Sequence, residues 1–314
     1  MARDRFGGDV LEIRRFEAVI GGHRVAAGVQ PRCGANLVSL QVDGQEYLYY
    51  DEKLLRGPDE MYTGCFIMFP TPCRIPEGKY EFRGRKVTQT KGGQLITIHG
   101  LVRDEPFQAE LSGNEVQCAL DITPDHPVYE GFPFPGRLIV NMKLVKRGLQ
   151  YSFRFENRGK SPAPVGFGLH PFWRVPGQRK DVYVRVPCQR SLLMKNLIPT
   201  GGAEPVAGTK LDLRQPRCLA DLDVDNVFID RIDDEPAVVE YRDLRKRVAL
   251  RADKVFSHQI CYAPPGKPFV CVENLTCAPN AVNLQSAPPE ISGLRVVEPG
   301  QSLAGTTRFI VQDL

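Results

Sequence analysis

The chain is built from short runs of residues that favour β-strands, and this feature restricts its fold more than any other. Alternating or β-branched runs occupy residues 16–20, 35–42, 95–99, 137–144, 150–157, 182–186 and 238–241. Glycine, proline and Asn/Asp clusters interrupt them at short intervals, and the 26 prolines argue against long helices. Many strands without helical crossovers predict an all-β fold, a large antiparallel β-sandwich.

Turn signals and the lack of a linker add detail to this prediction. The segments VDGQE (42–46) and FRGRK (82–86) each hold a glycine where a tight hairpin turn needs a positive φ angle. Residues 51–56 favour a short helix. The sequence contains neither an internal repeat nor a low-complexity linker, so residues 1–314 are expected to form a single domain, as large β-folds often do.

Composition and charge exclude several classes of protein. Hydrophobic residues make up 42% of the chain, enough for a sizeable core, so disorder is not expected. The 41 Lys and Arg nearly balance the 37 Asp and Glu, which argues against a dedicated nucleic-acid binder. The sequence has no apolar stretch near the roughly 18 residues of a membrane helix.

Targeting signals and cysteines point to a cytoplasmic location. The first residues, MARDRFGGDVLEIRRF, carry charges but no apolar core of a signal peptide. The nine cysteines are scattered and odd in number, without a C-x-x-C pair or matching histidine spacing, so neither a zinc site nor a disulfide framework is predicted. Reduced thiols in a cytoplasmic protein are the simplest interpretation.

Several stretches set a charged or titratable side chain among apolar or turn residues. They are FPTPCRI with Arg74, TIHG with His99, VGFGLHPFW with His170, DLDVDNVFID with Asp225 and FVCVENL with Glu273. A buried imidazole needs a hydrogen-bond partner and can transfer a proton near neutral pH. Such side chains converging in one cleft would suit acid–base chemistry.

Each of these residues, taken singly, also has a structural interpretation. Arg74 would be a surface arginine with a buried stem, and His99 would bond a backbone carbonyl at a strand end. Asp225 would bond its own backbone in a turn, Glu273 would face water at a sheet margin, and His170 would be a satisfied core histidine. The residues alone leave these alternatives open.

Eight motifs in order extend over nearly the whole chain. They are PRCGANLVSLQVDGQEYLYY, FPTPCRIPEGKYEFRG, IHGLVRDEPF, YEGFPFPGRLIVNMKLVKRGLQYSFRFENRG, GFGLHPFW, DVDNVFI, VCVENLTCAPNAVN and VVEPGQSLAGTTRFIV. Through them the sequence resembles the aldose 1-epimerase (mutarotase) family, including the branch of hexose-6-phosphate epimerases. The resemblance implies a galactose mutarotase-like β-sandwich that interconverts the α and β anomers of a sugar. This chemistry needs an acid and a base but neither a metal nor a redox cofactor.

The resemblance also implies roles for individual residues. His170 aligns with the general acid and Glu273 with the general base. His99 aligns with a second histidine that bonds the sugar near its ring oxygen and shares the proton work. Asp225 aligns with an aspartate that holds sugar hydroxyls, and Arg74 with a substrate-binding arginine. A histidine of ordinary pKa near 6.5 suits the acid, and a glutamate suits the base if its surroundings raise its pKa.

The sequence departs from the family pattern at three positions near this site. Cys73 stands where asparagine is expected before the arginine. Phe107 replaces a tryptophan and is expected to offer a smaller aromatic surface to the sugar. Phe172, in His-Pro-Phe, replaces a tyrosine and loses a hydroxyl near the acid. The resemblance implies that it contacts the sugar beside His170, whereas its own sequence context is more typical of a core residue. These departures bear on substrate identity more than on proton transfer.

Two other functions and two kinds of sugar stay open. A non-catalytic carbohydrate-binding protein would not need both His170 and Glu273, and a glycosidase would pair Asp225 with Glu273. The partner is expected to be a small sugar, either a free hexose or a hexose phosphate.

A phosphate carries about two negative charges and calls for basic side chains. The candidates are Arg103, after the His-Gly segment, and Lys79, Arg83, Arg85 and Lys86 around one hairpin. A charged hairpin tip is usually only solvated, so the sequence leans toward a neutral aldose.

Overall fold

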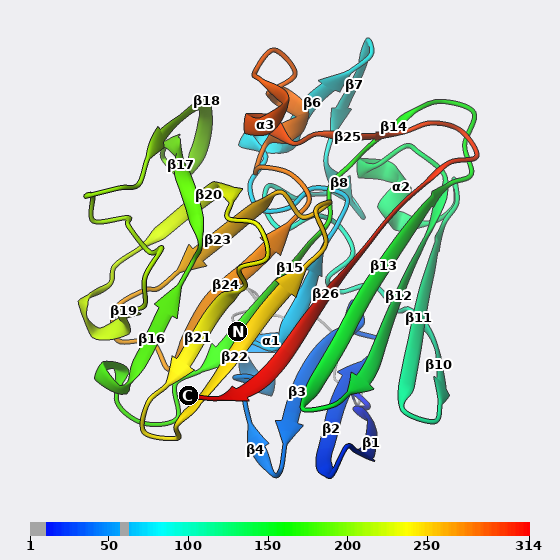
Figure 1. Ribbon diagram of the computed structural model, residues 1–314. Coiled ribbons are helices and arrows are strands. Elements are labelled where there is room, and N and C mark those ends of the chain that lie inside the picture. The colour runs from blue at the N-terminus through cyan, green and yellow to red at the C-terminus, as the bar shows by residue number, and fades with distance from the viewer. Residues whose placement is uncertain (1–10, 57–62) are drawn as a thin grey trace.

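The computed structural model describes residues 11–56 and 63–314, and two large antiparallel sheets dominate them (Figure 1). The first sheet has eleven strands. In order across the sheet they are β1 (Arg14–Ile20), β2 (His23–Gln30), β3 (Asn36–Val42), β5 (Cys65–Met68), β15 (Gly168–Arg174), β24 (Phe269–Leu275), β23 (His258–Tyr262), β20 (Asp225–Arg231), β17 (Cys188–Lys195) and β18 (Ile198–Pro205), with β4 (Gln45–Glu46) paired to β3.

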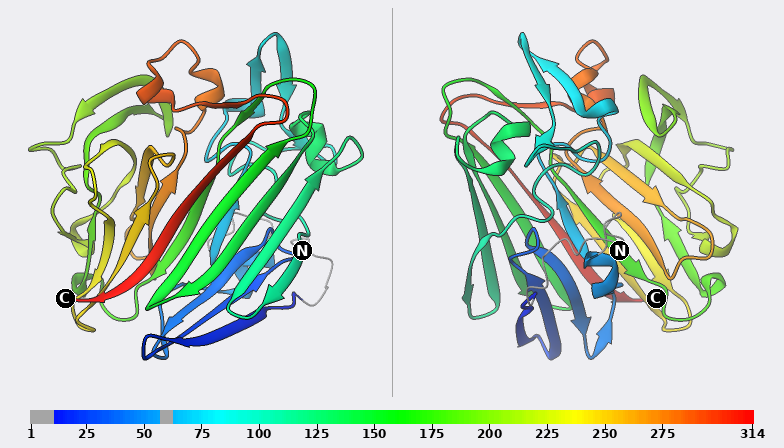
Figure 2. Two further views of the ribbon diagram at one scale, coloured as in Figure 1. Left: turned by 45° about the vertical axis from the view of Figure 1, so that its right-hand side comes forward. Right: turned by 180° about the vertical axis from the view of Figure 1, so that it is seen from behind.

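The second sheet has nine strands and packs against the first. Its order is β10 (Gln108–Ser112), β11 (Glu115–Ile122), β12 (Gly136–Val145), β13 (Gly148–Asn157), β26 (Ser302–Asp313), β22 (Lys246–Ala252), β21 (Ala237–Tyr241), β16 (Val182–Arg185) and β19 (Arg217–Cys218). The long C-terminal strand β26 pairs with β13 on one side and β22 on the other (Figure 2). The predicted all-β sandwich is therefore confirmed.

Three short ribbons and several short helical turns lie outside the two large sheets. Three two-stranded ribbons are β6 (Lys79–Phe82) with β7 (Arg85–Thr88), β8 (Thr90–Lys91) with β9 (Gln94–Leu95), and β14 (Ala163–Val165) with β25 (Arg295–Val297). The α-helices and 3-10 turns are α1 (Glu52–Arg56), α2 (Pro127–Gly131), α3 (Pro289–Ser292), η1 (Pro76–Gly78), η2 (Arg179–Asp181), η3 (Leu219–Asp221) and η4 (Ala281–Asn283). Within the described ranges, every helix is too short or too polar to span a bilayer.

Local sequence signals predict most of these elements correctly. Both hairpins form at the expected glycines, because Asp43 and Gly44 have φ angles of 52° and 84° and Arg83 and Gly84 have 48° and 80°. Helix α1 also forms where a short helix was expected. The predicted strand over residues 95–99 is wrong, since β9 ends at residue 95 and His99 adopts a left-handed φ of 64°.

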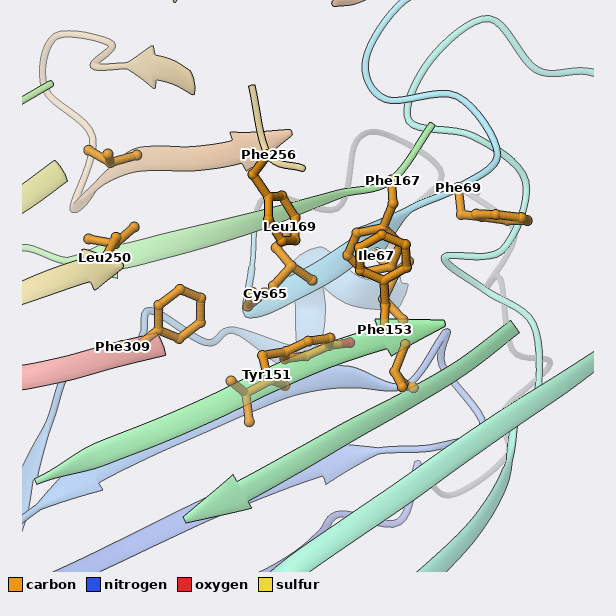
Figure 3. Close-up of a cluster of buried hydrophobic side chains, with 14 of the residues drawn as sticks. Cys65, Ile67, Phe69, Tyr151, Phe153, Phe167, Leu169, Leu250, Phe256 and Phe309 are labelled. Carbon is orange, nitrogen blue, oxygen red and sulfur yellow. The ribbon is translucent and has the colours of Figure 1, made fainter. Parts of the chain in front are cut away.

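The core between the sheets is built from large apolar side chains (Figure 3). Phe153 of β13 stacks on Phe167, just before β15, with ring centroids 3.9 Å apart and an interplanar angle of 4°. The single tryptophan, Trp173, packs edge-on against Phe309 of β26 and donates its indole N–H to the carbonyl of Val272. Burying aromatic side chains of this size contributes about 1.5–3 kcal/mol each.

Strand alternation gives β15 two different faces. Leu169 and Trp173 point into the core between the sheets, so His170 and Phe172 point to the opposite, outer face of the eleven-stranded sheet. A second apolar cluster, which includes Phe66 and Phe172, covers this outer face. Seen from behind in Figure 2, the orange strand β24 lies in the middle of this sheet. A polar side chain here is buried without belonging to the main core.

Candidate active site

Neighbouring strands place His170 and Glu273 opposite each other. Strands β15 and β24 are antiparallel, and their register pairs Gly168 with Leu275 and Phe172 with Cys271. His170 and Glu273 lie midway between those pairs and therefore face each other on the same side of the sheet. The distance from His170 Nε2 to Glu273 Oε1 is 3.4 Å. The structure thus brings the two residues predicted as acid and base together.

Both side chains of this pair are buried and have unused polar atoms. Glu273 is 1% exposed and His170 is 6% exposed. Within the described part of the chain, His170 Nδ1 and both Glu273 carboxylate oxygens have no hydrogen-bond partner. Buried polar atoms are rarely left unsatisfied in native proteins. A polar ligand that bonds these atoms would remove that cost, which is the property expected of a binding site.

Burial shifts the two pKa values in opposite directions. Loss of solvation raises the pKa of Glu273 well above its usual range, and the nearby Asp225 carboxylate raises it further. Loss of solvation lowers the pKa of His170, and the guanidinium groups of Arg103 and Arg74 add to this effect. The pair therefore favours a neutral imidazole beside a protonated carboxyl group, so one titratable proton is carried by either the imidazole or the carboxylate.

His99 lies next to this pair on a bend rather than on a strand. Its ring is 5.0 Å from the His170 ring in an edge-to-face arrangement. Its Nδ1 atom is 3.2 Å from the sulfur of Met68, and its backbone N–H donates to the carbonyl of Cys73. Burial lowers the pKa of His99 well below its usual value, followed by the effect of His170. His99 is therefore also neutral near pH 7.

The left-handed turn at residues 99 and 100 explains how His99 reaches the pair. Gly100 has a φ of 70°, and a Cβ atom there would lie 2.3 Å from the carbonyl oxygen of Phe69. A glycine is required at such a close approach. Isolated bridges on either side, Arg74 with Ile98 and Phe69 with Gly100, fix the bend against the rest of the chain.

Three charged residues predicted at the site are half-buried around the pair. Arg74 follows Cys73, which has a left-handed φ of 53°, and Asp225 begins β20 opposite Tyr262. Arg103 and Arg74 both act electrostatically on His170. Partial exposure of charged groups beside a buried acid–base pair is the arrangement expected where a polar ligand enters.

The two predicted aromatic contacts occupy different places. The Phe172 ring stacks on the His170 ring, with centroids 4.6 Å apart and an interplanar angle of 12°, and is 1% exposed. It supports the imidazole from behind. Phe107 belongs to the core between the sheets, and this placement favours a packing role over contact with a ligand.

Two residues that sequence reasoning missed also hold the histidines. The Phe66 ring on β5 lies 4.7 Å from the His170 ring and 5.2 Å from the His99 ring. Met68, two residues later on the same face, contacts His99. Strand alternation in the apolar run CFIM at 65–68 predicts that Phe66 and Met68 share one face of the strand. It does not predict that this face contacts His99 and His170.

The basic hairpin proposed for phosphate has local partners instead. Arg83 pairs with Glu298 at 3.4 Å, and Arg85 donates to the carbonyl of Pro133 at 2.7 Å. Lys79 pairs with Glu77 at 2.9 Å. Three of the four basic side chains of this hairpin thus have partners within the protein, in contacts that are exposed to solvent.

The structure is a large antiparallel β-sandwich with a buried histidine–glutamate pair on the outer face of one sheet. The family model for aldose 1-epimerase matches residues 25–309. The chain therefore belongs to the aldose 1-epimerase family.

Individual relatives and solved structures agree with this family. Protein YihR of Escherichia coli K12, named as uncharacterized, is 23% identical over 257 residues, which are 80% of each chain. Human galactose mutarotase is 28% identical over 151 residues, 46% of this chain and 43% of the human protein.

Two solved structures show the same fold. The Slr1438 protein of Synechocystis sp. PCC 6803 has a TM-score of 0.79 at 20% identity, covering 98% of this chain and 97% of that one. A galactose mutarotase-like protein of Clostridium acetobutylicum has a TM-score of 0.77 at 17% identity, covering 96% and 99%.

Proposed function

We propose that this protein is an aldose 1-epimerase that interconverts the α and β anomers of a hexose, with His170 and Glu273 as the proton-transfer residues. The observation that carries the proposal is the buried cross-strand pair, with 3.4 Å between His170 Nε2 and Glu273 Oε1 and open hydrogen-bonding atoms on both. A purely structural pair would be expected to satisfy those atoms within the protein.

The reaction requires one acid and one base at the hemiacetal. His170 gives a proton to the ring oxygen while Glu273 takes the proton of the anomeric hydroxyl. The bond from C1 to the ring oxygen breaks as the C1 carbonyl forms, which opens the ring to an aldehyde. Rotation about C1–C2 turns the other carbonyl face toward the new hydroxyl. The reverse transfers then close the ring as the opposite anomer.

The reaction cycle requires one titratable proton to move between His170 and Glu273 by way of the sugar. A protonated His170 with an ionised Glu273 begins ring opening, and a neutral His170 with a protonated Glu273 remains when the ring is open. Burial favours the second distribution. Hydrogen bonds from a bound sugar to the carboxylate favour the first, because bonding to the charged form lowers the pKa of an acid.

The surrounding polar residues are proposed to hold the sugar. Asp225 accepts hydrogen bonds from sugar hydroxyls, and Arg74 donates hydrogen bonds to sugar oxygens. His99 bonds the sugar near its ring oxygen. The aromatic rings of Phe66 and Phe172 fix the His170 imidazole in place, so its proton is directed at one atom.

A neutral aldose is the proposed substrate. The hairpin arginines are already paired with protein groups, and Arg103 acts as a charge near the imidazole. A hexose 6-phosphate would need a basic cluster with free donors.

Polarimetry of freshly dissolved α-glucose, α-galactose and glucose 6-phosphate tests the function. Replacing His170 with alanine, or Glu273→Gln, is expected to slow anomer interconversion by about 10²–10⁴-fold, the usual contribution of a positioned acid or base. Circular dichroism confirms folding. Full activity in either variant would refute the assignment, and sugar binding without turnover in the unmodified protein would favour a binding protein.

A further inference from the structure

A thiol accompanies the buried acid–base pair. Cys271 lies two residues before Glu273 on β24, so strand alternation places both side chains on the outer face of the sheet. One ligand-type atom each of Cys271, Glu273 and His170 lies within 4.8 Å of the other two. Thiolate sulfur, imidazole nitrogen and carboxylate oxygen are the three protein ligands that zinc binds.

The three side chains are shielded from water and keep open coordination sites. Cys271 is fully buried, and Glu273 and His170 are more than nine-tenths buried. The two Glu273 oxygens and His170 Nδ1 find no hydrogen-bond partner among residues 11–56 and 63–314. The open Glu273 oxygens, together with His170 Nε2 at 3.4 Å from Oε1, are therefore available to coordinate a cation.

We propose that Cys271, His170 and Glu273 form a three-ligand site for Zn²⁺, and that an ion bound there blocks the acid–base pair. The inhibitory effect rests on the proposed function, whereas metal binding does not. Zinc would occupy the lone pairs that otherwise exchange protons with a sugar, so the ion and the sugar would compete.

The distances suit a tetrahedral ion. Zinc bound at about 2.0–2.1 Å to both nitrogen and oxygen separates those atoms by about 3.3–3.5 Å. The His170 Nε2 and Glu273 Oε1 atoms are already 3.4 Å apart. A sulfur at about 2.3 Å from the ion lies about 3.5 Å from the other ligands. The Cys271 ligand atom lies within 4.8 Å of the ligand atoms of His170 and Glu273. Three protein ligands leave the fourth position for water.

The charges of the site balance when the ion binds. Burial raises the pKa of the Cys271 thiol well above its usual value, and Glu273 adds to the effect. Zinc therefore displaces the thiol proton and the single proton of the His170–Glu273 pair. Two protons leave and one dication enters, so the net charge of the site does not change. Asp225 favours a cation here, and it offsets part of the repulsion from the two nearby guanidinium groups.

Cobalt spectroscopy of the metal-free full chain tests the site directly. Titration with Co²⁺ is expected to saturate at about one ion per chain with a thiolate-to-cobalt charge-transfer band in the near ultraviolet, which Zn²⁺ then removes. The band should grow as the pH rises, because binding releases protons. Absence of a thiolate band from the unmodified protein would overturn the proposal.

Matched cysteine variants locate the ion. Cys271→Ser should abolish the band and raise the zinc concentration needed for inhibition by at least about tenfold, while anomer interconversion without zinc continues. Cys261→Ser is the control, because Cys261 is buried on the adjacent strand β23 but belongs to the core between the sheets. This variant should keep the band.

The experiments can refute the proposed activity and the proposed metal site independently. A thiolate band with no anomer interconversion in the unmodified protein would refute the proposed function and keep the site. Active protein whose zinc sensitivity is the same with and without the Cys271 sulfur would refute the site and keep the function. If Cys271→Ser does not fold, Cys271→Ala and the spectrum of the unmodified protein still decide the question.

Discussion

His258 should make the stability of this protein depend on pH in the acid range. The side chain is fully buried at the start of β23. Its Nε2 donates to the Ile291 carbonyl at 2.9 Å, which leaves Nδ1 as an acceptor 2.9 Å from Ser257 Oγ. This arrangement holds the ring in its neutral form. Burial lowers the pKa of His258 to about 4.

The sign and size of the effect follow from the two pKa values. The unfolded chain binds a proton at this histidine below about pH 6.5, whereas the folded chain does so only below about 4. Stability from the neutral ring is therefore complete above pH 6.5 and is lost as the pH falls toward 4. A difference of about 2.5 pKa units corresponds to about 3 kcal/mol of unfolding free energy.

Urea unfolding of His258→Gln between about pH 7 and pH 4 tests this reasoning. Glutamine retains a donor for the Ile291 carbonyl but does not titrate, so the variant should be less stable by about 1 kcal/mol at pH 7. The difference between the unmodified protein and the variant should then shift by about 3 kcal/mol in favour of the variant as the pH falls. Parallel stability curves would refute the assignment of a neutral buried imidazole.

Three further predictions concern the site and its surroundings. Gly100→Ala places a Cβ 2.3 Å from a backbone oxygen and should lower the free energy of unfolding by about 2–4 kcal/mol, measured by thermal unfolding. Gly92→Ala is the control, because Gly92 also has a positive φ but has open space around its Cβ position, and it should cost about 1 kcal/mol. Equal costs for the two variants would contradict the close approach at Gly100. Asp225→Asn removes a charge that raises the pKa of Glu273, so the acid limb of the pH profile of kcat/KM should shift to lower pH. An acid limb that does not move would count against Glu273 as the base. Arg83→Glu should leave calorimetric binding of glucose and glucose 6-phosphate unchanged at low salt, and selective loss of the phosphate would reverse the preference for a neutral sugar.

The sequence predicts strands and turns well because their signals are local. Alternation at residues 150–157 and the glycines at 44 and 84 depend on neighbours only, and the structure confirms them. The error at residues 95–99 has a tertiary cause. The backbone of residues 96–99 bonds to separate positions at Gln89, Ile75 and Cys73, so it forms isolated contacts in place of a continuous ladder.

The site is predicted as a set of residues but not as a geometry. His170 and Glu273 are far apart in the chain, and only the antiparallel register of β15 and β24 places them face to face. The stack of Phe172 on His170 and the support from Phe66 depend on the same register. Propensity and motif order carry no information about register between distant strands, so these contacts required the structure.

The two faces of β15 link the evolution of the site to that of the core. Leu169 and Trp173 fill the space between the sheets, and His170 sits between them in sequence on the other side of the same strand. A one-residue deletion here would put the imidazole into the core and an apolar side chain at the pair. Insertions and deletions in this strand should therefore be selected against because they disrupt the folded core as well as the acid–base pair. New sugar preferences should therefore arise by drift in the loops that carry Arg74, His99 and Arg103, where length can change without exchanging inside and outside.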